Sequence, residues 1–136
     1  PMPDLNRIYV GEKVALRLKQ LKGKTGLTPN LLCRLGFCLS LEEPGIPDPD
    51  LYDDETAREF NRYTLTGPWD KFFFALLRER MAQDGLDVEE ELEEQFLAHL
   101  SRGVLNLYSR IDELEDITTL VKNAHRKADI ANSETE

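Results

Sequence analysis

Apolar and polar residues alternate at the start of the chain and then change to a helical spacing. In residues 5–10, Ile8 and Val10 fall on one face of a strand and the residues between them fall on the other, which is the two-residue period of a β-strand. Gly11 ends this run, and the apolar positions that follow are Val14, Leu18 and Leu21. Their spacing of four and three predicts a first helix with one apolar stripe.

A glycine-bearing turn and a second helix are predicted next. Gly23 and Gly26 lie within four residues, and because glycine adopts positive φ without strain, we expect the first helix to end in a turn over residues 22–26. Thr28 followed by Pro29 is a typical helix start, with a capping hydroxyl and a proline at the first helical position. The buried side of this second helix would carry Leu31, Leu32, Leu35, Cys38 and Leu39.

The order of strand, helix, turn and capped helix is the layout of ribbon-helix-helix DNA-binding proteins, in which two chains pair their strands. Because a single short strand is unstable by itself, this interpretation predicts an oligomer. The same order also describes helical hairpins that have no nucleic-acid role, and this alternative stays open.

The rest of the chain is predicted to be helical apart from one connector. Three prolines in residues 44–49 exclude a regular helix there. One helix is expected over residues 51–63, and another after Thr66, where Trp69 and three phenylalanines follow. Two more helices are expected from Val88 onward, with a possible break at Gly103. So wide an aromatic face favours core packing, with subunit contact as the alternative.

The expected fold class is therefore mainly α, in a single domain of 136 residues. Within it we expect a basic ribbon-helix-helix-like segment at 1–43 and an acidic helical bundle at 44–124 that shares the core and supplies oligomer contacts. Residues 125–136 have little apolar content and are expected to form an exposed tail.

Charge divides the chain into two parts of opposite sign. The whole sequence has a net charge of −9, but its first 38 residues hold seven Lys and Arg against two Asp and Glu, a net +5. The remaining residues hold 10 basic against 24 acidic residues, a net −14. A clustered positive field is typical of a surface that binds phosphates, and the acidic remainder would restrict where nucleic acid can bind.

The basic charge is densest around the predicted turn at residues 22–28. Lysines flank Gly23, Gly26 lets the backbone approach a ligand, and the N–H groups of the next helix start would face an anion. A solvated basic turn is the alternative. The candidate DNA-binding residues are Lys13, Arg17, Lys19, Lys22, Gly23, Lys24, Thr25 and Gly26.

Catalytic, metal and cofactor chemistry finds little support in the sequence. Gly23-Lys24-Thr25 imitates the end of a nucleotide-binding P-loop, but Leu18 stands where that loop needs glycine. The acidic run at 84–94 fits a solvated helix start, with Asp87 and Glu90 as a capping box. The cysteines Cys33 and Cys38 and the two histidines lack the spacing of a zinc site, and we expect both cysteines to be buried. We therefore expect no cofactor, no membrane span and a cytoplasmic location.

Three runs of residues resemble one known family. They are LNRIYV at 5–10, LKGKTGLTPNLLCR at 21–34 and SLEEPG at 40–45, and they are similar to DndE, the small component of the bacterial DNA phosphorothioation system. That system replaces a non-bridging oxygen of the DNA backbone with sulfur, using separate catalytic chains. The resemblance implies a non-catalytic homo-oligomer, a tetramer, that binds duplex DNA and favours nicked duplex. It also implies that Lys22 and Lys24 carry the contact and that other subunits of the modification complex are partners.

Three functional hypotheses follow. The first is an accessory subunit that binds the DNA backbone through its basic segment. The second is a protein adaptor that docks onto other subunits and contacts DNA only through them. The third is a ribbon-helix-helix repressor, which would discriminate between DNA sequences through base contacts.

Overall fold

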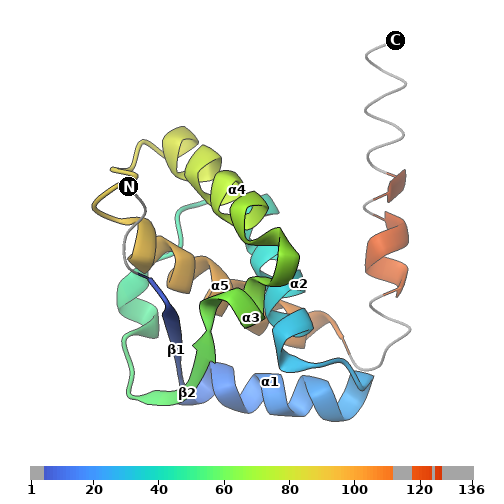
Figure 1. The fold of residues 1–136 in the computed structure, drawn as a ribbon. Coiled ribbons are helices and arrows are strands. Elements are labelled where there is room, and N and C mark those ends of the chain that lie inside the picture. Colours follow the sequence, from blue (N-terminus) through green and yellow to red (C-terminus); the bar gives the residue numbers. More distant parts are fainter. Residues whose placement is uncertain (1–4, 112–117, 124, 127–136) are drawn as a thin grey trace.

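The computed structural model describes residues 5–111, 118–123 and 125–126, and in these ranges the chain is mainly helical (Figure 1). The strands are β1 (Arg7–Gly11) and β2 (Thr56–Asn61), and 3-10 turns lie at Pro49–Tyr52 and Gly67–Trp69. The helices are α1 (Glu12–Thr25), α2 (Pro29–Glu42), α3 (Arg62–Thr66), α4 (Asp70–Gln83) and α5 (Leu92–Arg110). The prediction of a mainly α, single-domain fold that begins with a strand and two helices is confirmed.

The first strand pairs with a strand of the same chain. β1 and β2 form an antiparallel two-stranded sheet with Ile8 opposite Phe60 and Tyr9 opposite Glu59. The predicted helix over residues 51–63 is therefore wrong, because most of that segment is β2 and the turn before it. Only Phe60 of β2 is buried, so the segment has little strand pattern of its own, and it becomes a strand because β1 supplies hydrogen-bonding partners.

This pairing changes the argument for an oligomer. The sequence alone suggested that β1 needs a strand from another chain, whereas β2 satisfies one edge of β1 within the monomer. The ribbon-helix-helix order of elements is present, but the pairing of strands between two chains is not needed to stabilise it. The structural argument for a ribbon-helix-helix repressor is removed with it.

Gly11 has a specific role where β1 turns into α1. The Asp54 carboxylate accepts a hydrogen bond from the Glu12 N–H at 2.9 Å, and a side chain at position 11 would collide with that carboxylate. An acidic group at a helix start also interacts favourably with the helix dipole. The segment between the 3-10 turn and β2 therefore caps α1 across 42 positions of sequence.

Helices α2 and α5 cross in backbone contact at two glycines. They make the most extensive helix–helix contact of the molecule, and a Cβ added to Gly36 would lie 2.8 Å from the Val104 nitrogen. Gly103 faces the Gly36 backbone and leaves no space for a side chain. The possible helix break at Gly103 does not occur: α5 runs unbroken from Leu92 to Arg110, and the glycine serves close packing.

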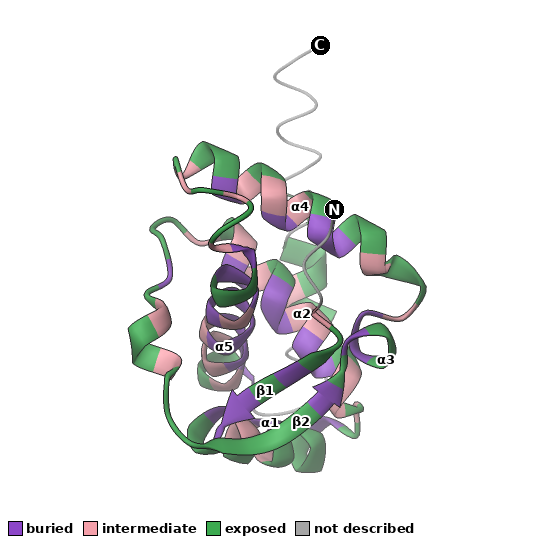
Figure 2. Cartoon of the chain, turned by 60° about the vertical axis from the view of Figure 1, so that its left-hand side comes forward, coloured by how far each residue is buried: buried purple, intermediate pink, exposed green. Residues whose placement is uncertain are grey.

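Aromatic rings fill the core between α2, α4 and α5, and Figure 2 shows purple, buried stretches of ribbon on these three helices. Phe74 stacks on Phe96 with ring centroids 4.9 Å apart, and Phe37 contacts both Phe96 and Phe73. The helix predicted after Thr66 is confirmed, although its first turn is 3-10. Its aromatic residues divide: Phe73 and Phe74 are buried, whereas Trp69 and Phe72 are 57% and 59% exposed.

Two arginines from different helices hold the C-terminal end of α2. Arg80 of α4 donates to the Leu41 and Gly45 carbonyls at 2.7 and 2.6 Å. Arg102 of α5 donates to the Ser40 carbonyl at 2.8 Å and to the Gly45 carbonyl at 3.0 Å. Cations suit the negative end of a helix dipole and satisfy carbonyls that have no partner inside the helix.

Three smaller predictions have mixed outcomes. Cys33 is buried as expected, but Cys38 is exposed because it lies on the outer side of α2. Asp87 accepts from the Glu90 N–H as a capping residue, but the reciprocal carboxylate is that of Glu91, not Glu90. The predicted tail at 125–136 lies almost wholly outside the described residues, and His125 within it is exposed.

Candidate nucleic-acid interface

The basic residues of the N-terminal segment lie along a helix and not around an open turn. α1 continues through Gly23 to Thr25, and the helix ends at Gly26, whose φ is 75° and whose N–H donates to the Lys22 carbonyl at 2.8 Å. The predicted two-glycine turn over residues 22–26 is therefore wrong in extent. Of the two glycines only Gly26 needs positive φ, and Gly23 is an exposed helical position with open space around its Cα.

The helix separates the basic side chains into two rows. Val14, Leu18, Leu21 and Thr25 are the buried residues of α1. At 100° per residue, Lys13, Arg17 and Lys24 fall on one flank of this buried stripe, and Lys22 and Lys19 fall on the other flank and further out. From position 13 to position 24 the charge extends over about 17 Å at 1.5 Å per residue. This is roughly the axial rise of five steps between successive phosphates along one DNA strand.

Tyr108 of α5 organises the first row. The Arg17 Cζ lies 4.1 Å from the centroid of the Tyr108 ring, and the Lys24 Nζ lies 4.8 Å from it. Arg17 also donates to the Gln20 Oε1 at 2.8 Å. Because both cations contact one ring, the conformational freedom of both side chains is reduced, and their charges stay near Tyr108.

Lys13, Lys19 and Lys22 are exposed. Over the part of the chain that the structure describes, none of the three makes an ion pair with an acidic side chain. Their charge is therefore directed to solvent, where a phosphate could approach it.

Two other cations of the +5 segment have structural roles. Arg7 of β1 forms an ion pair with Glu59 of β2. Arg34 of α2 donates to the Leu65 carbonyl at 2.6 Å and to the Thr64 carbonyl at 3.2 Å, so it caps α3. The candidate surface is thus narrower than the charge count of the segment suggested.

Thr25 and the start of α2 are turned inward. Thr25 is buried, and its hydroxyl donates to the Leu21 carbonyl and accepts from the Leu27 N–H. The Thr28 hydroxyl accepts from the Leu31 N–H at 3.3 Å, which confirms Thr28 as the N-cap of α2. These hydroxyls shape the connection between the helices, and the lysines before them provide the charge.

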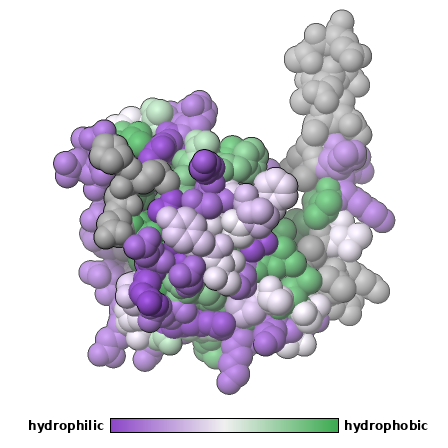
Figure 3. Space-filling view, viewed as in Figure 1, coloured by the Kyte–Doolittle hydropathy of each residue, from purple (hydrophilic) through white to green (hydrophobic). Residues whose placement is uncertain are grey.

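Elsewhere in the described ranges, three buried or half-buried arginines pair with acidic side chains. Arg62 forms a bidentate pair with Asp70 at 3.0 and 2.9 Å, Arg80 pairs with Asp84, and Arg102 pairs with Glu43. Hydrophilic side chains line the lower edge of the face in Figure 3, where α1 lies, and paler and hydrophobic side chains gather over α3 and the start of α4. The aromatic side chains exposed on these elements are Tyr63, Trp69 and Phe72.

The groups that could take part in catalysis are poorly placed for it. Burial raises the pKa of the Cys33 thiol to about 12, and burial together with the nearby Arg102 and Arg80 lowers the pKa of His99 to about 4. His99 Nδ1 lies 2.8 Å from the Ser40 hydroxyl inside the core, away from solvent. In the described residues, no group of three or more His, Cys, Asp or Glu side chains could hold a metal ion. No described helix has the length and apolar character needed to cross a membrane.

The sequence located most of this surface but missed Tyr108. Tyr108 belongs to α5, and the sequence around it, residues 107–110, carries no pattern that indicates packing beside α1. Its contact with Arg17 joins positions 91 apart and exists only once α5 has folded against α1. The lysines were identified because charge density is visible in one segment of sequence.

Comparisons with known proteins agree on one family. The family model described as DNA sulphur modification protein DndE matches residues 7–114. The crystal structure of DndE from Escherichia coli B7A, involved in DNA phosphorothioation modification, superposes with a TM-score of 0.62 at 28% identity, covering 79% of this chain and 98% of that one. The crystal structure of a DndE mutant, in which two glycines are replaced by lysine, has a TM-score of 0.59 at 25% identity, covering 79% and 99%. A search of curated proteins found no match.

Proposed function

The chain belongs to the DndE family of DNA sulphur modification proteins, and from this premise we propose that it is a non-catalytic, DNA-binding accessory subunit of DNA phosphorothioation. In this role it is a homo-oligomer, a tetramer, that binds the backbone of duplex DNA in the cytoplasm and favours nicked duplex. The tetramer and the preference for nicks are taken from the family resemblance.

One observation carries the proposal: α1 directs its lysines outward. Lys13, Lys19 and Lys22 are exposed, and Arg17 and Lys24 lie together on the Tyr108 ring. Because the helix fixes the backbone that carries these cations, only their side chains must be ordered when they meet a row of phosphates. In an oligomer the row repeats, so the summed positive field is larger than one subunit provides.

The shape of this surface favours backbone recognition over base readout. The cations follow a helix that is fixed along its buried stripe by α2 and α5. A nicked duplex bends more easily than an intact one, so a multivalent basic surface that reads backbone shape can favour it without base contacts. The strongly acidic remainder of the chain confines phosphate to the α1 side.

The non-catalytic part of the proposal has separate support. The Cys33 thiol is buried with a raised pKa, and His99 and Ser40 hydrogen-bond to each other in the core. Cys38 is exposed, but partial burial and the nearby Glu42 carboxylate raise the pKa of its thiol, which disfavours the thiolate. Sulfur transfer needs an accessible thiolate or another exposed nucleophile. We assign this chemistry to other subunits of the system.

A charge-reversal titration tests DNA binding. The double variant Lys22→Glu/Lys24→Glu should bind intact and nicked duplexes much more weakly in a fluorescence-anisotropy titration at several salt concentrations. The slope of log K against log salt should fall in magnitude by about two per bound subunit, because each phosphate contact contributes about 0.9. A matched control is Lys71→Glu/Lys122→Glu, which changes the net charge equally at exposed positions on α4 and near the C-terminus.

The control variant should retain most of the affinity and the whole salt slope. Equal loss in both variants would mean that net charge alone decides binding and would refute a localised α1 surface. Unchanged affinity of Lys22→Glu/Lys24→Glu would refute the assignment of the contact to these two lysines, and absence of binding by the wild-type protein at every salt concentration would refute the DNA-binding proposal itself.

A second candidate function is a protein adaptor. Tyr63, Trp69 and Phe72 are all more than half exposed on α3 and around the start of α4, and exposed aromatic side chains of this size are typical of protein interfaces. An adaptor that touches DNA only through other subunits would not shift the anisotropy of labelled DNA when purified alone, at any salt concentration.

A further inference from the structure

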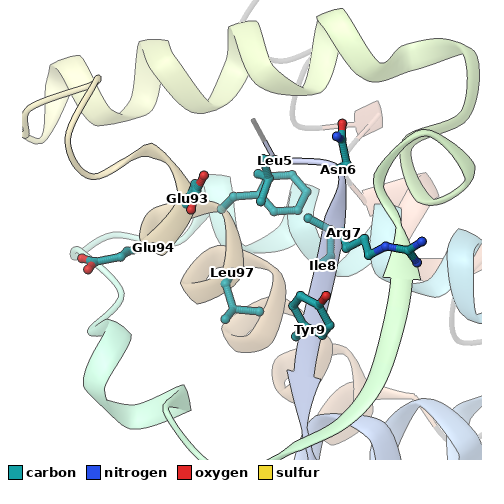
Figure 4. Close-up of a pocket in the computed structure, with 9 residues that line it drawn as sticks. Leu5, Asn6, Arg7, Ile8, Tyr9, Glu93, Glu94 and Leu97 are labelled. Atoms are coloured by element: carbon teal, nitrogen blue, oxygen red, sulfur yellow. The ribbon is translucent and has the colours of Figure 1, made fainter. Parts of the chain in front are cut away.

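A groove runs along the outer side of β1, away from the candidate DNA surface. It has a volume of about 550 Å³ and lies between β1 and the first turns of α5. In Figure 4, Glu93, Glu94 and Leu97 lie on the opposite side of β1 from β2. The groove therefore opens on the strand edge that β2 does not use.

The backbone of β1 presents hydrogen-bonding groups to this groove. Arg62 N–H donates to the Asn6 carbonyl at 2.8 Å, so the pair of residues 6 and 62 is hydrogen-bonded. Along the same register, the Ile8–Phe60 pair is also hydrogen-bonded, while Arg7 and Tyr9 belong to the alternate pairs. In an antiparallel pair, the N–H and C=O groups of the alternate residues point away from the partner strand. Arg7 and Tyr9 thus direct theirs to the outer edge.

No group in the described residues pairs with this edge. Neither Arg7 nor Tyr9 makes a backbone hydrogen bond to α5 or to any other described element on that side. A strand edge with two donors and two acceptors beside an open groove can add another strand.

The residues that line the groove indicate which side chains an added strand would carry. Leu5, Phe96 and Leu97 form an apolar floor, and Glu93 and Glu94 are exposed at its rim. Within the described chain, neither carboxylate makes an ion pair. Two carboxylates repel phosphate and attract Lys or Arg, so the rim disfavours nucleic acid and favours a basic peptide.

We propose that this groove binds an extended, basic segment of a partner protein, which adds to β1 as a third strand. The peptide backbone pairs with Arg7 and Tyr9, its apolar or small side chains cover the floor, and its basic side chains meet Glu93 and Glu94. A second copy of β1 is a poorer occupant, because its single basic residue, Arg7, is already paired with Glu59. The site is independent of the α1 lysines, so it holds whether or not the chain binds DNA.

Peptide binding followed by NMR tests this proposal on the full chain. The probe is an acetylated hexapeptide of alternating threonine and lysine, and the matched peptide has glutamate in place of lysine. We expect the lysine peptide to shift the amide resonances of Arg7 and Tyr9 and to slow their hydrogen exchange, and the glutamate peptide to do neither. The charge-reversed variant Glu93→Lys/Glu94→Lys should weaken the lysine peptide about tenfold, because two attractive pairs become repulsive.

A backbone variant isolates the strand edge. Tyr9→Pro removes an outward N–H together with the phenol ring, at a position where an edge strand tolerates proline, whereas Tyr9→Val also removes the ring but keeps the N–H. We expect Tyr9→Pro to abolish binding of the lysine peptide and Tyr9→Val to retain it. The proposal would be overturned if the affinity for the lysine peptide changed neither in Glu93→Lys/Glu94→Lys nor in Tyr9→Pro. The proposal would also be overturned if the Arg7 and Tyr9 amides of the protein alone were protected from hydrogen exchange and lost this protection on dilution, because self-association would then occupy the edge.

Discussion

The crossing of α2 and α5 is the part of the fold least tolerant of added atoms. We predict that Gly103→Ala strongly destabilises the protein and that Gly36→Ala does so less. A Cβ on Gly36 would lie 2.8 Å from the Val104 nitrogen, and ordinary contact begins near 3.4 Å. The two helices must therefore separate by about 0.6 Å, or more for Gly103, whose added carbon would fall on the Gly36 carbonyl.

The expected cost follows from overpacking of a close-packed interior. Insertion of a methyl group where neighbours cannot move costs about 1–3 kcal/mol and sometimes more, and replacing a helical glycine with alanine returns about 0.5–1 kcal/mol. We expect a net loss of about 1–2 kcal/mol for Gly36→Ala and at least about 3 kcal/mol for Gly103→Ala. The larger loss is a substantial part of the roughly 5–15 kcal/mol that stabilises a domain.

Urea unfolding monitored by circular dichroism measures these differences, and Gly23→Ala supplies the control. Gly23 is also helical, but open space surrounds it, so alanine there should stabilise the protein by about 0.5–1 kcal/mol. If Gly103→Ala unfolds at the same urea concentration as the wild type, α2 and α5 are not in backbone contact and the reasoning fails.

Three further predictions address the core and the α1 surface. The pKa of His99 falls from 6.5 to about 4 on folding, so between these pH values the unfolded chain binds a proton that the folded chain does not. The free energy of unfolding should therefore fall by about 3 kcal/mol as the pH is lowered from 6.5 to 4. The variant His99→Phe should lack this pH dependence in a series of urea titrations. Arg62→Met should cost about 3–5 kcal/mol, because it leaves the Asp70 carboxylate without its bidentate partner, and the double variant Arg62→Met/Asp70→Leu should recover part of that loss in the same assay. Tyr108→Leu should weaken DNA binding by about twofold to fivefold with an unchanged salt slope, because it removes the platform under Arg17 and Lys24 but no charge; a changed slope in the anisotropy titration would contradict this role.

Local signals in the sequence were sufficient for several elements. The stripe of Val14, Leu18 and Leu21 correctly predicted the buried side of α1, and Thr28 with Pro29 correctly predicted the start of α2. Periodicity and capping depend on residues within a few positions of one another, so they can be read from one segment. The density of lysine near residue 22 is also a property of one short segment, and it predicted a basic surface there.

The errors occurred where distant segments decide the structure. β2 forms because β1 lies beside it, and Gly103 remains helical because Gly36 packs against it. Glycine in a helix is unfavourable by local propensity, yet close approach of two backbones compensates for this cost. Neither outcome has a signal within its own stretch of sequence.

The sequence by itself determined the mainly helical class, the ends of the first two helices to within a turn, and the concentration of positive charge in one segment. The tertiary structure alone decided that β1 pairs within the chain, that Arg7 and Arg34 serve the fold, and that Tyr108 gathers Arg17 and Lys24. The physical reason is that helix periodicity and charge density are properties of neighbouring residues. Strand pairing, ion pairs and cation–π contacts depend on residues that become neighbours only after the chain has folded.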